Sequence, residues 1–134
     1  MAYEAVVTDL LGNAGDPIQY KVSSAGTIPK GSLMEAEDLR TAKINSATNK
    51  PIAGIAAAEK NSTDSETSIA VYTNCIAKMT CSGAGITVGA EVVASAAGSQ
   101  IKAAETLDRE TGDVIGYAME SISNGETGLI RVQK

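Results

Sequence analysis

Hydrophobic and polar positions alternate over short distances along this chain of 134 residues, and this pattern predicts many short β-strands. Clusters of Gly, Pro, Asn, Asp and Ser recur about every 8 to 12 residues, and runs rich in Val, Ile and Thr lie between them. β-Branched runs between evenly spaced turns are typical of β-sandwiches and barrels. The runs define candidate strands at residues 4–8, 17–22, 32–36, 41–45, 52–58, 67–73, 75–80, 90–95, 100–103, 113–119 and 127–133.

The last run shows the alternation most clearly. Leu129 and Arg131 fall on one face of that strand, and Ile130 and Val132 fall on the other. Residues 102–110 are the candidate for a short helix, because their Ala and Glu content permits one, although a loop fits equally well. We therefore expect an all-β fold with at most one short helix, built as a compact sandwich-like or barrel-like body.

An internal repeat organises much of the chain. Residues 51–56 read PIAGIA and residues 113–118 read DVIGYA, and a polar loop followed by a Glu-Thr pair comes after each. An Ile-x-x-Gly motif precedes each copy, at 28–31 and at 86–89. The offsets between the copies are 58, 62 and 60 residues. This steady spacing predicts two similar lobes, at about 27–73 and 85–133, within a single body spanning 27–134.

Four glycines recur at matching places in the two lobes. Gly31 and Gly89 fit tight turns that precede a strand, where a positive φ or a close backbone approach is required. Gly54 and Gly116 lie inside apolar strands, where glycine usually marks a bulge, a barrel bend or the close approach of another strand. We interpret all four as structural turn or strand positions.

Residues 1–26 lie outside this repeat. They contain Gly12, Gly15, Pro17 and Gly26, and we interpret them as an extended N-terminal arm with a strand or two. Such an arm buries little apolar surface alone, so it is a candidate for strand addition to a neighbouring molecule.

Composition narrows the function classes. The chain has no His, Trp or Phe and only four Tyr, which excludes Ser–His–Asp and Cys–His catalysis and His-ligated zinc or haem. Alanine supplies 21 residues, whereas Val, Ile, Leu and Met together supply 31. Alanines bury little apolar area, so we expect a thin core of the kind that oligomerisation often supports.

The charge and the hydropathy of the chain argue against nucleic acid and membranes as partners. Eleven scattered Lys and Arg stand against 16 Asp and Glu, a net charge of −5, so we expect no direct nucleic-acid binding. No apolar run reaches the ~20 residues that span a membrane, and no signal peptide is evident, so we expect no membrane partner and synthesis in a cytoplasm.

Cys75 and Cys81 are expected to be free and partly buried, although a hairpin disulfide is geometrically possible. Two thiols without His make a poor metal site, so we expect no metal and no cofactor.

Two other functions stay open at this point. Glu35 and Glu37 share a face of their strand, which could suit a glycosidase pair or a cation site, although a charged edge that discourages strand pairing is the favoured interpretation. The two lobes could alternatively form a ligand-binding β-barrel module that holds a carbohydrate or another small molecule at the lobe junction. The chain lacks the Trp on which sugars often stack.

Three motifs make the chain resemble the capsid decoration, or cement, proteins of tailed phages, including the small lambda-type head-decoration proteins. They are the I-x-x-G-x-x-[LMV] pattern at 28–34, the G-[IV]-A pattern at 54–56 and the [ST]-I-x-V-[YF] pattern at 68–72. The similarity covers most of residues 17–133.

The resemblance implies a structural virion protein and not an enzyme. It implies a homotrimer, made in the host cytoplasm, on the outer surface of an expanded icosahedral capsid, where it clamps neighbouring major capsid subunits. It also implies that the N-terminal arm adds a strand to the capsid protein or to a neighbouring protomer. The apolar arm residues that the resemblance assigns to capsid binding are Tyr3, Val6, Val7, Leu10, Leu11, Ile18 and Tyr20.

Overall fold

The computed structural model describes residues 5–10, 16–22, 26–46, 50–61, 67–95, 99–105 and 113–134. Over these ranges the chain forms strands and no helix, so none of the described elements could cross a membrane as a helix. The strands are β1 (Val6–Leu10), β2 (Ile18–Val22), β3 (Leu33–Asp38), β4 (Thr41–Ile44), β5 (Ile52–Ala56), β6 (Ser68–Tyr72), β7 (Asn74–Cys81), β8 (Glu91–Ala94), β9 (Gln100–Ala103), β10 (Gly116–Ala118) and β11 (Thr127–Gln133). The all-β prediction is confirmed, and each candidate strand is present.

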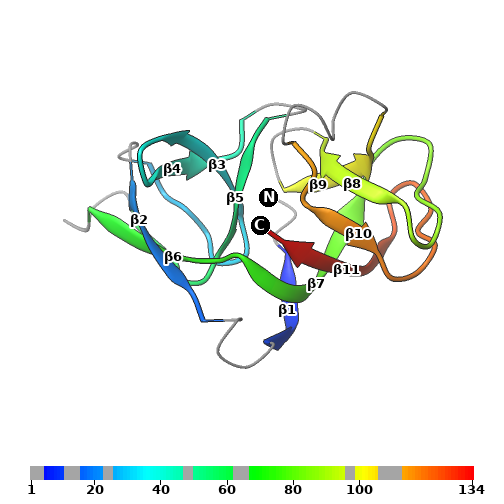
Figure 1. Cartoon of the computed structure of the whole chain (residues 1–134), viewed down its shortest axis with the longest axis horizontal. Coiled ribbons are helices and arrows are strands. Elements are labelled where there is room, and N and C mark those ends of the chain that lie inside the picture. The colour runs from blue at the N-terminus through cyan, green and yellow to red at the C-terminus, as the bar shows by residue number, and fades with distance from the viewer. Residues whose placement is uncertain are drawn as a thin grey trace.

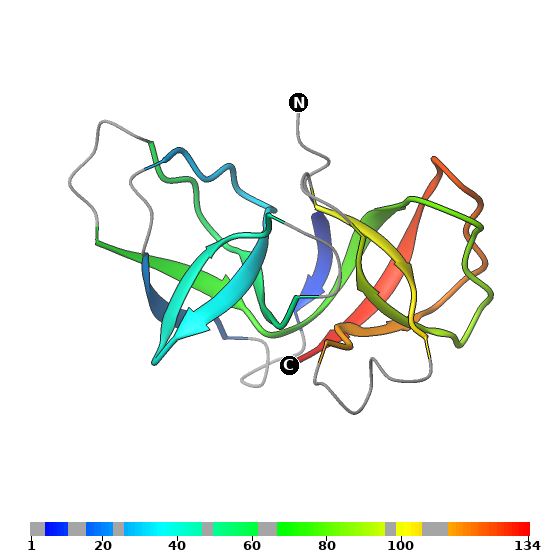
Figure 2. The same cartoon turned by 90° about the horizontal axis from the view of Figure 1, so that it is seen from above.

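The strands form two barrels that lie side by side (Figures 1 and 2). Lobe 1 is the closed barrel β2-β4-β3-β5-β6. Lobe 2 follows the order β7-β11-β10-β8-β9, and a parallel pairing between β7 and β9 closes it. Lobe 1 has the matching parallel pair, between β2 and β4. The chain therefore builds the same five-stranded unit twice.

Strand register shows how closely the two lobes correspond. Ile55 lies opposite Tyr72 in lobe 1, and Tyr117 lies opposite Arg131 in lobe 2, at offsets of 62 and 59 residues. The bridge from Ile28 to Lys60 in lobe 1 likewise matches a bridge from Ile86 to Ile122 in lobe 2. The structural repeat begins one strand earlier than the predicted lobes at 27–73 and 85–133, because β2 and β7 are the first strand of each barrel.

The N-terminal segment requires a correction. The predicted arm, residues 1–26, is not separate from the body where the structure describes it. β1 pairs with β7 as the edge of the lobe 2 sheet, and β2 pairs with β4 and β6 to close lobe 1. The physical reason is burial, because Tyr20 and Val22 pack against the lobe 1 core and Val7 packs against the lobe 2 core.

The core is thin in lobe 1 and larger in lobe 2. The lobe 1 cluster holds three alanines among its seven buried residues, which are Ile28, Met34, Ala42, Ala53, Ala56, Ile69 and Val71. The second cluster fills lobe 2 and extends across the junction to Leu33, Ile52 and Ile55 of lobe 1. Each fully buried Ile or Leu contributes roughly 1.5–3 kcal/mol. The larger cluster therefore holds the two lobes together.

The four repeated glycines occupy the strained or crowded positions that the sequence predicted. Gly31 and Gly89 have φ values of 90° and 87°, which an L side chain rarely adopts. A Cβ on Gly54 would collide with the carbonyl oxygen of Tyr72, and a Cβ on Gly116 would collide with that of Arg131. Each of the latter two glycines lets two neighbouring strands of its barrel approach closely.

Candidate interaction surfaces

The structure separates the apolar residues that were assigned to a capsid-binding arm. Val6 on β1 is 57% exposed and Ile18 on β2 is 38% exposed, and the two belong to different sheets. Val7 and Tyr20 are half-buried against the cores, so their apolar surface is largely used within the chain. Leu10 continues β1, where its backbone lies opposite Cys75. Tyr3 and Leu11 lie outside the described residues.

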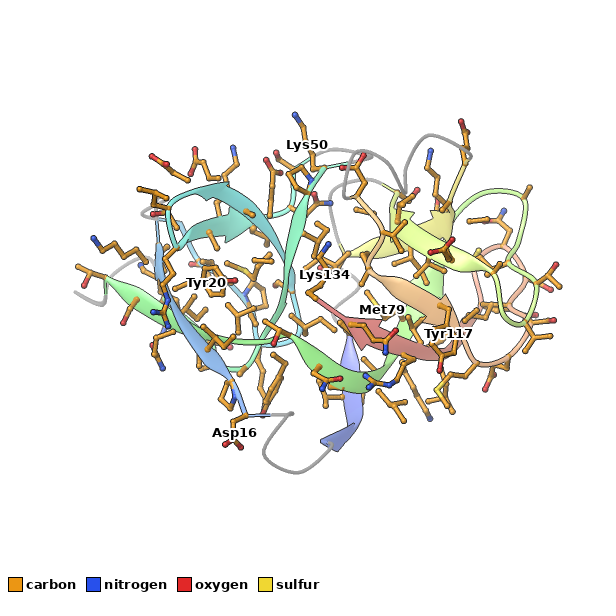
Figure 3. All side chains as sticks on the ribbon, viewed as in Figure 1. Asp16, Tyr20, Lys50, Met79, Tyr117 and Lys134 are labelled. Atoms are coloured by element: carbon orange, nitrogen blue, oxygen red, sulfur yellow. The ribbon has the colours of Figure 1, made fainter. Side chains whose placement is uncertain are left out.

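Lobe 2 presents a broad sheet surface to solvent. Alternation along β10 and β11 points Tyr117, Leu129 and Arg131 away from the barrel interior, and Tyr117 lies laterally beside Glu91 of β8. Val88, Tyr117 and Met119 are 58%, 39% and 41% exposed. Figure 3 shows Tyr117 at the periphery of lobe 2, whereas the buried Met79 belongs to its core. We call this surface the lobe 2 face, and its residues are Val88, Glu91, Tyr117, Met119, Leu129 and Arg131.

The corresponding surface of lobe 1 is buried. Leu33 of β3 lies opposite Ile55 of β5, which lies opposite Tyr72 of β6. This lateral row, which we call the lobe 1 face, packs against the lobe 2 core cluster. The repeat register aligns it with Glu91, Tyr117 and Arg131 in lobe 2. The same barrel surface is therefore apolar and covered in one lobe, and mixed and open in the other.

The two matching hairpins also differ in how far their turn residues are exposed to solvent. In the β8–β9 hairpin, Ser99 has a φ of 65° and is buried, and its Oγ accepts a hydrogen bond from the Leu33 N–H at 2.8 Å. In the β3–β4 hairpin, Arg40 occupies the matching position with a φ of 50°, and it is exposed. Leu39 beside it is 89% exposed. Ser99 thus contacts the other lobe, whereas its counterpart Arg40 and the neighbouring Leu39 are exposed to solvent.

The candidate carboxylate pair surrounds a lysine. Lys43 Nζ lies 3.8 Å from Glu35 Oε1 and 3.9 Å from Glu37 Oε1. Glu35 is buried, and its Oε2 also accepts hydrogen bonds from the backbone N–H and the hydroxyl of Ser46, at 3.4 and 3.3 Å. The two carboxylates do share a strand face, and Lys43, across the β3–β4 pair, lies near both and offsets one of their two charges.

Both cysteines are free, as the sequence predicted, and both are fully buried on the interior side of β7. Burial raises the pKa of the Cys75 thiol to about 11, and the nearby Arg131 charge only partly offsets this. Burial also raises the pKa of the Cys81 thiol, against a backbone hydrogen bond from Gly85. Both thiols are therefore protonated at neutral pH. Across the described ranges, no three His, Cys, Asp or Glu residues gather into a possible metal site.

Two depressions on the described surface are shallow. One depression of about 290 Å³ lies over the turns at 84–87 and 121–124 of lobe 2. A second, of about 420 Å³, is lined by residues near the C-terminus, including Asn74, Arg131 and Lys134. At the lobe junction, where a ligand was the alternative expectation, apolar side chains of the lobe 1 face pack against the lobe 2 cluster.

Comparison with known proteins relates this architecture to phage heads. Residues 13–133 match the family model described as phage cement protein. The fold is similar to the crystal structure of the N base of the head fiber gp8.5 of bacteriophage phi29, with a TM-score of 0.55 and 16% sequence identity. That match covers 87% of this chain and 92% of the phi29 chain. No curated protein matches the sequence.

Proposed function

The chain belongs to the phage cement protein family, and we propose that it binds the outer surface of an expanded icosahedral capsid as a homotrimer and clamps neighbouring major capsid subunits. A structural, capsid-associated role follows from the family itself. The observation that carries the finer proposal is the match over residues 13–133, which includes both barrels and is not confined to one motif. We propose that the role is mechanical and involves no catalysis.

A clamp needs separate contact points on a body that does not deform. The continuous cluster that joins the lobes supports such a body, because separating the lobes would expose Leu33, Ile52 and Ile55 to water. Exposed apolar side chains outside the lobe 2 face occur at Ile18 in lobe 1 and at Val6 on the lobe 2 sheet. Contacts at both lobes would allow one molecule to hold two neighbouring subunits.

The edge of β1 supports a particular mode of capsid contact. Among the described strands, β1 pairs only with β7, so its other edge can accept an extended segment of the capsid protein by strand addition. Val6 on this strand is 57% exposed and adds an apolar contact. This proposal keeps the expected strand addition by the N-terminal segment but places it on a strand that is already fixed in the lobe 2 sheet.

Preferential binding to the expanded capsid would stabilise that form of the capsid. A ligand that binds the expanded capsid and not the unexpanded one favours the expanded form by RT ln(1 + [L]/Kd), about 2.7 kcal/mol per site at one hundred times Kd. Each trimer repeats its contacts three times, so weak individual contacts combine into strong attachment. A small chain with a thin core can therefore stabilise a large shell.

Co-sedimentation with purified capsids tests the proposal. We expect the chain to pellet with expanded capsids, to leave unexpanded ones free, and to raise the temperature at which expanded capsids break. Val6→Asp should weaken this binding, whereas Thr127→Asp, an exposed position on β11 of the same sheet, should not. A chain that never pellets with expanded capsids would contradict the proposal. Deletion through residue 20 is unsuitable, because it removes most of β2 and opens lobe 1.

A further inference from the structure

The two lobes of the chain contact each other through a hydrogen bond between Ser99 of lobe 2 and Leu33 of lobe 1. Ser99, which directly precedes β9 in lobe 2, contacts the outer face of lobe 1, where its Oγ accepts the Leu33 N–H at 2.8 Å. Both residues are buried, at 1% and 0% exposure, so the contact is an internal part of the molecule. The structure thus contains one example of how one copy of this barrel binds another.

The internal repeat identifies the surfaces that could make the same contact a second time. Arg40 matches Ser99, because each has a positive φ and each hairpin has the same register, with Glu35 opposite Lys43 and Val93 opposite Lys102. Glu91 matches Leu33, because each lies beside the corresponding strand of its barrel. The Leu39–Arg40 tip of lobe 1 and the lobe 2 face are the two counterparts. The tip is exposed, and the lobe 2 face is exposed at Val88, Tyr117 and Met119.

We propose that these surfaces bind each other between copies, so that the Leu39–Arg40 tip of one chain docks on the lobe 2 face of the next. This inference rests on the proposed homotrimer and names the interface that builds it. The contact between chains brings together the same two positions of the barrel as the contact within the chain. A charge pair replaces the hydrogen bond of Ser99, because the guanidinium of Arg40 has no acceptor for the Glu91 N–H, and Arg40 of one copy lies beside the Glu91 carboxylate of another.

The chemistry of the two surfaces is complementary. Arg40 and Glu91 carry opposite charges at the positions that the repeat brings together. Arg40 Nε donates to the Gln19 carbonyl at 3.1 Å, and its guanidinium has further N–H donors for a carboxylate. Leu39, at 89% exposure, would meet Val88, Tyr117 and Met119. Tyr, Met and Arg are enriched at protein interfaces, which fits this face better than an ordinary solvated surface.

The proposed contact uses a different surface on each of the two copies, and this asymmetry allows a ring to form. One copy supplies the hairpin tip and the other supplies the face, so the interface is heterologous, and such contacts form closed rings when the rotation closes. Lobes 1 and 2 would alternate around the ring. In a homotrimer the ring contains six barrels, three copies of two, with every hairpin tip docked on the next barrel.

A cysteine pair tests this geometry directly. The chain carrying both Arg40→Cys and Glu91→Cys is treated with a short bismaleimide, and denaturing gels should show covalent dimers and trimers. Each single variant should stay monomeric on the gel, because the contact joins position 40 to position 91 and not to itself. Native Cys75 and Cys81 are buried and do not interfere. Absence of a ladder from the double variant, or equal ladders from the single variants, would overturn the proposal.

A second variant keeps the inference separate from the proposed function. Leu39→Asp should make the chain monomeric by light scattering with an unchanged circular dichroism spectrum, whereas Ile18→Asp, an exposed apolar residue of the same lobe, should leave the oligomer intact. A wild-type chain that is monomeric at all concentrations contradicts the inference, as does a Leu39→Asp chain that stays trimeric. If the ladder forms but capsids are not bound, the proposed function fails and the interface stands.

Discussion

The two lobes share one barrel plan but treat the same outer surface differently. In lobe 1 the row Leu33, Ile55 and Tyr72 is covered by lobe 2. In lobe 2 the matching row contains Glu91, Tyr117 and Arg131 and is open to solvent. The comparison shows that, in a duplicated fold, the same barrel surface carries different side chains depending on whether the other lobe covers it. A face with a permanent partner in the chain carries uncharged, mainly apolar side chains, whereas a face that must remain soluble before assembly mixes apolar side chains with charges.

The largest expected effect comes from making lobe 1 resemble lobe 2. Leu33→Glu removes a fully buried leucine and places a carboxylate inside the lobe junction without a cation to pair it. We expect the free energy of unfolding to fall by about 4 kcal/mol or more, from lost burial and charge desolvation. Urea denaturation followed by circular dichroism measures it. A loss below about 1 kcal/mol would show that the junction does not hold the lobes together.

Glycine substitutions test the close approach of β10 and β11 in lobe 2. A Cβ on Gly116 would collide with the Arg131 carbonyl, so we expect Gly116→Ala to cost about 3 kcal/mol of stability. Gly89→Ala is the matched control, because its φ is positive but no atom lies within 4 Å of the added Cβ, and we expect about 1 kcal/mol. Thermal unfolding of both variants measures the difference. Equal losses would contradict the crowding at Gly116.

An alkaline pH series tests the burial of the lobe 2 core. The pKa of Cys75 rises from 9.0 to about 11 on folding, so the folded state retains this proton where the unfolded state has lost it. Its contribution to stability is complete below pH 9 and is lost as the pH rises to 11, by about 2 kcal/mol. Urea unfolding of the wild type and of Cys75→Ala across this range should show the smaller pH slope in the variant. Identical slopes would indicate a thiol that is already accessible to water.

The smallest expected loss of stability comes from Glu91→Leu, which places the lobe 1 residue at the matching position of the lobe 2 face. Glu91→Leu replaces a partly buried residue on the lobe 2 face, and not a fully buried one, so we expect a smaller loss of stability than from Leu33→Glu, of about 1 kcal/mol. The contrast with Leu33→Glu is the informative quantity, and the same urea titration provides it. A loss from Glu91→Leu as large as that from Leu33→Glu would contradict the difference between the two faces.

Much of this architecture could be read from the sequence. Alternation in runs such as 127–133 predicted the strands, and the spacing of Gly54 and Gly116 predicted the repeat. The role of β2 was missed because its sequence, IQYKV, has no recognisable counterpart in NCIAKMTC of β7. Backbone pairing and burial, not residue identity, make these two strands equivalent.

The difference between the two faces was also missed, although the sequence contained a signal for it. Aligning the repeats through Gly54 and Gly116 sets Ile55 against Tyr117, and aligning them through Gly31 and Gly89 sets Leu33 against Glu91. Apolar residues in one copy and polar or amphipathic residues in the other indicate that only one copy is covered. Which surface covers it depends on the relative placement of the two barrels, and local patterns do not determine that placement.

The disruption temperature of expanded capsids tests the central claim most directly. Capsids that lack the chain are heated with and without a saturating amount of the purified wild-type protein, and the release of packaged DNA or of capsid subunits is followed. A cement protein should raise the disruption temperature in proportion to the number of copies bound, and Val6→Asp should reduce the increase. An unchanged disruption temperature at full occupancy would contradict the account, because the chain would then decorate the capsid without stabilising it.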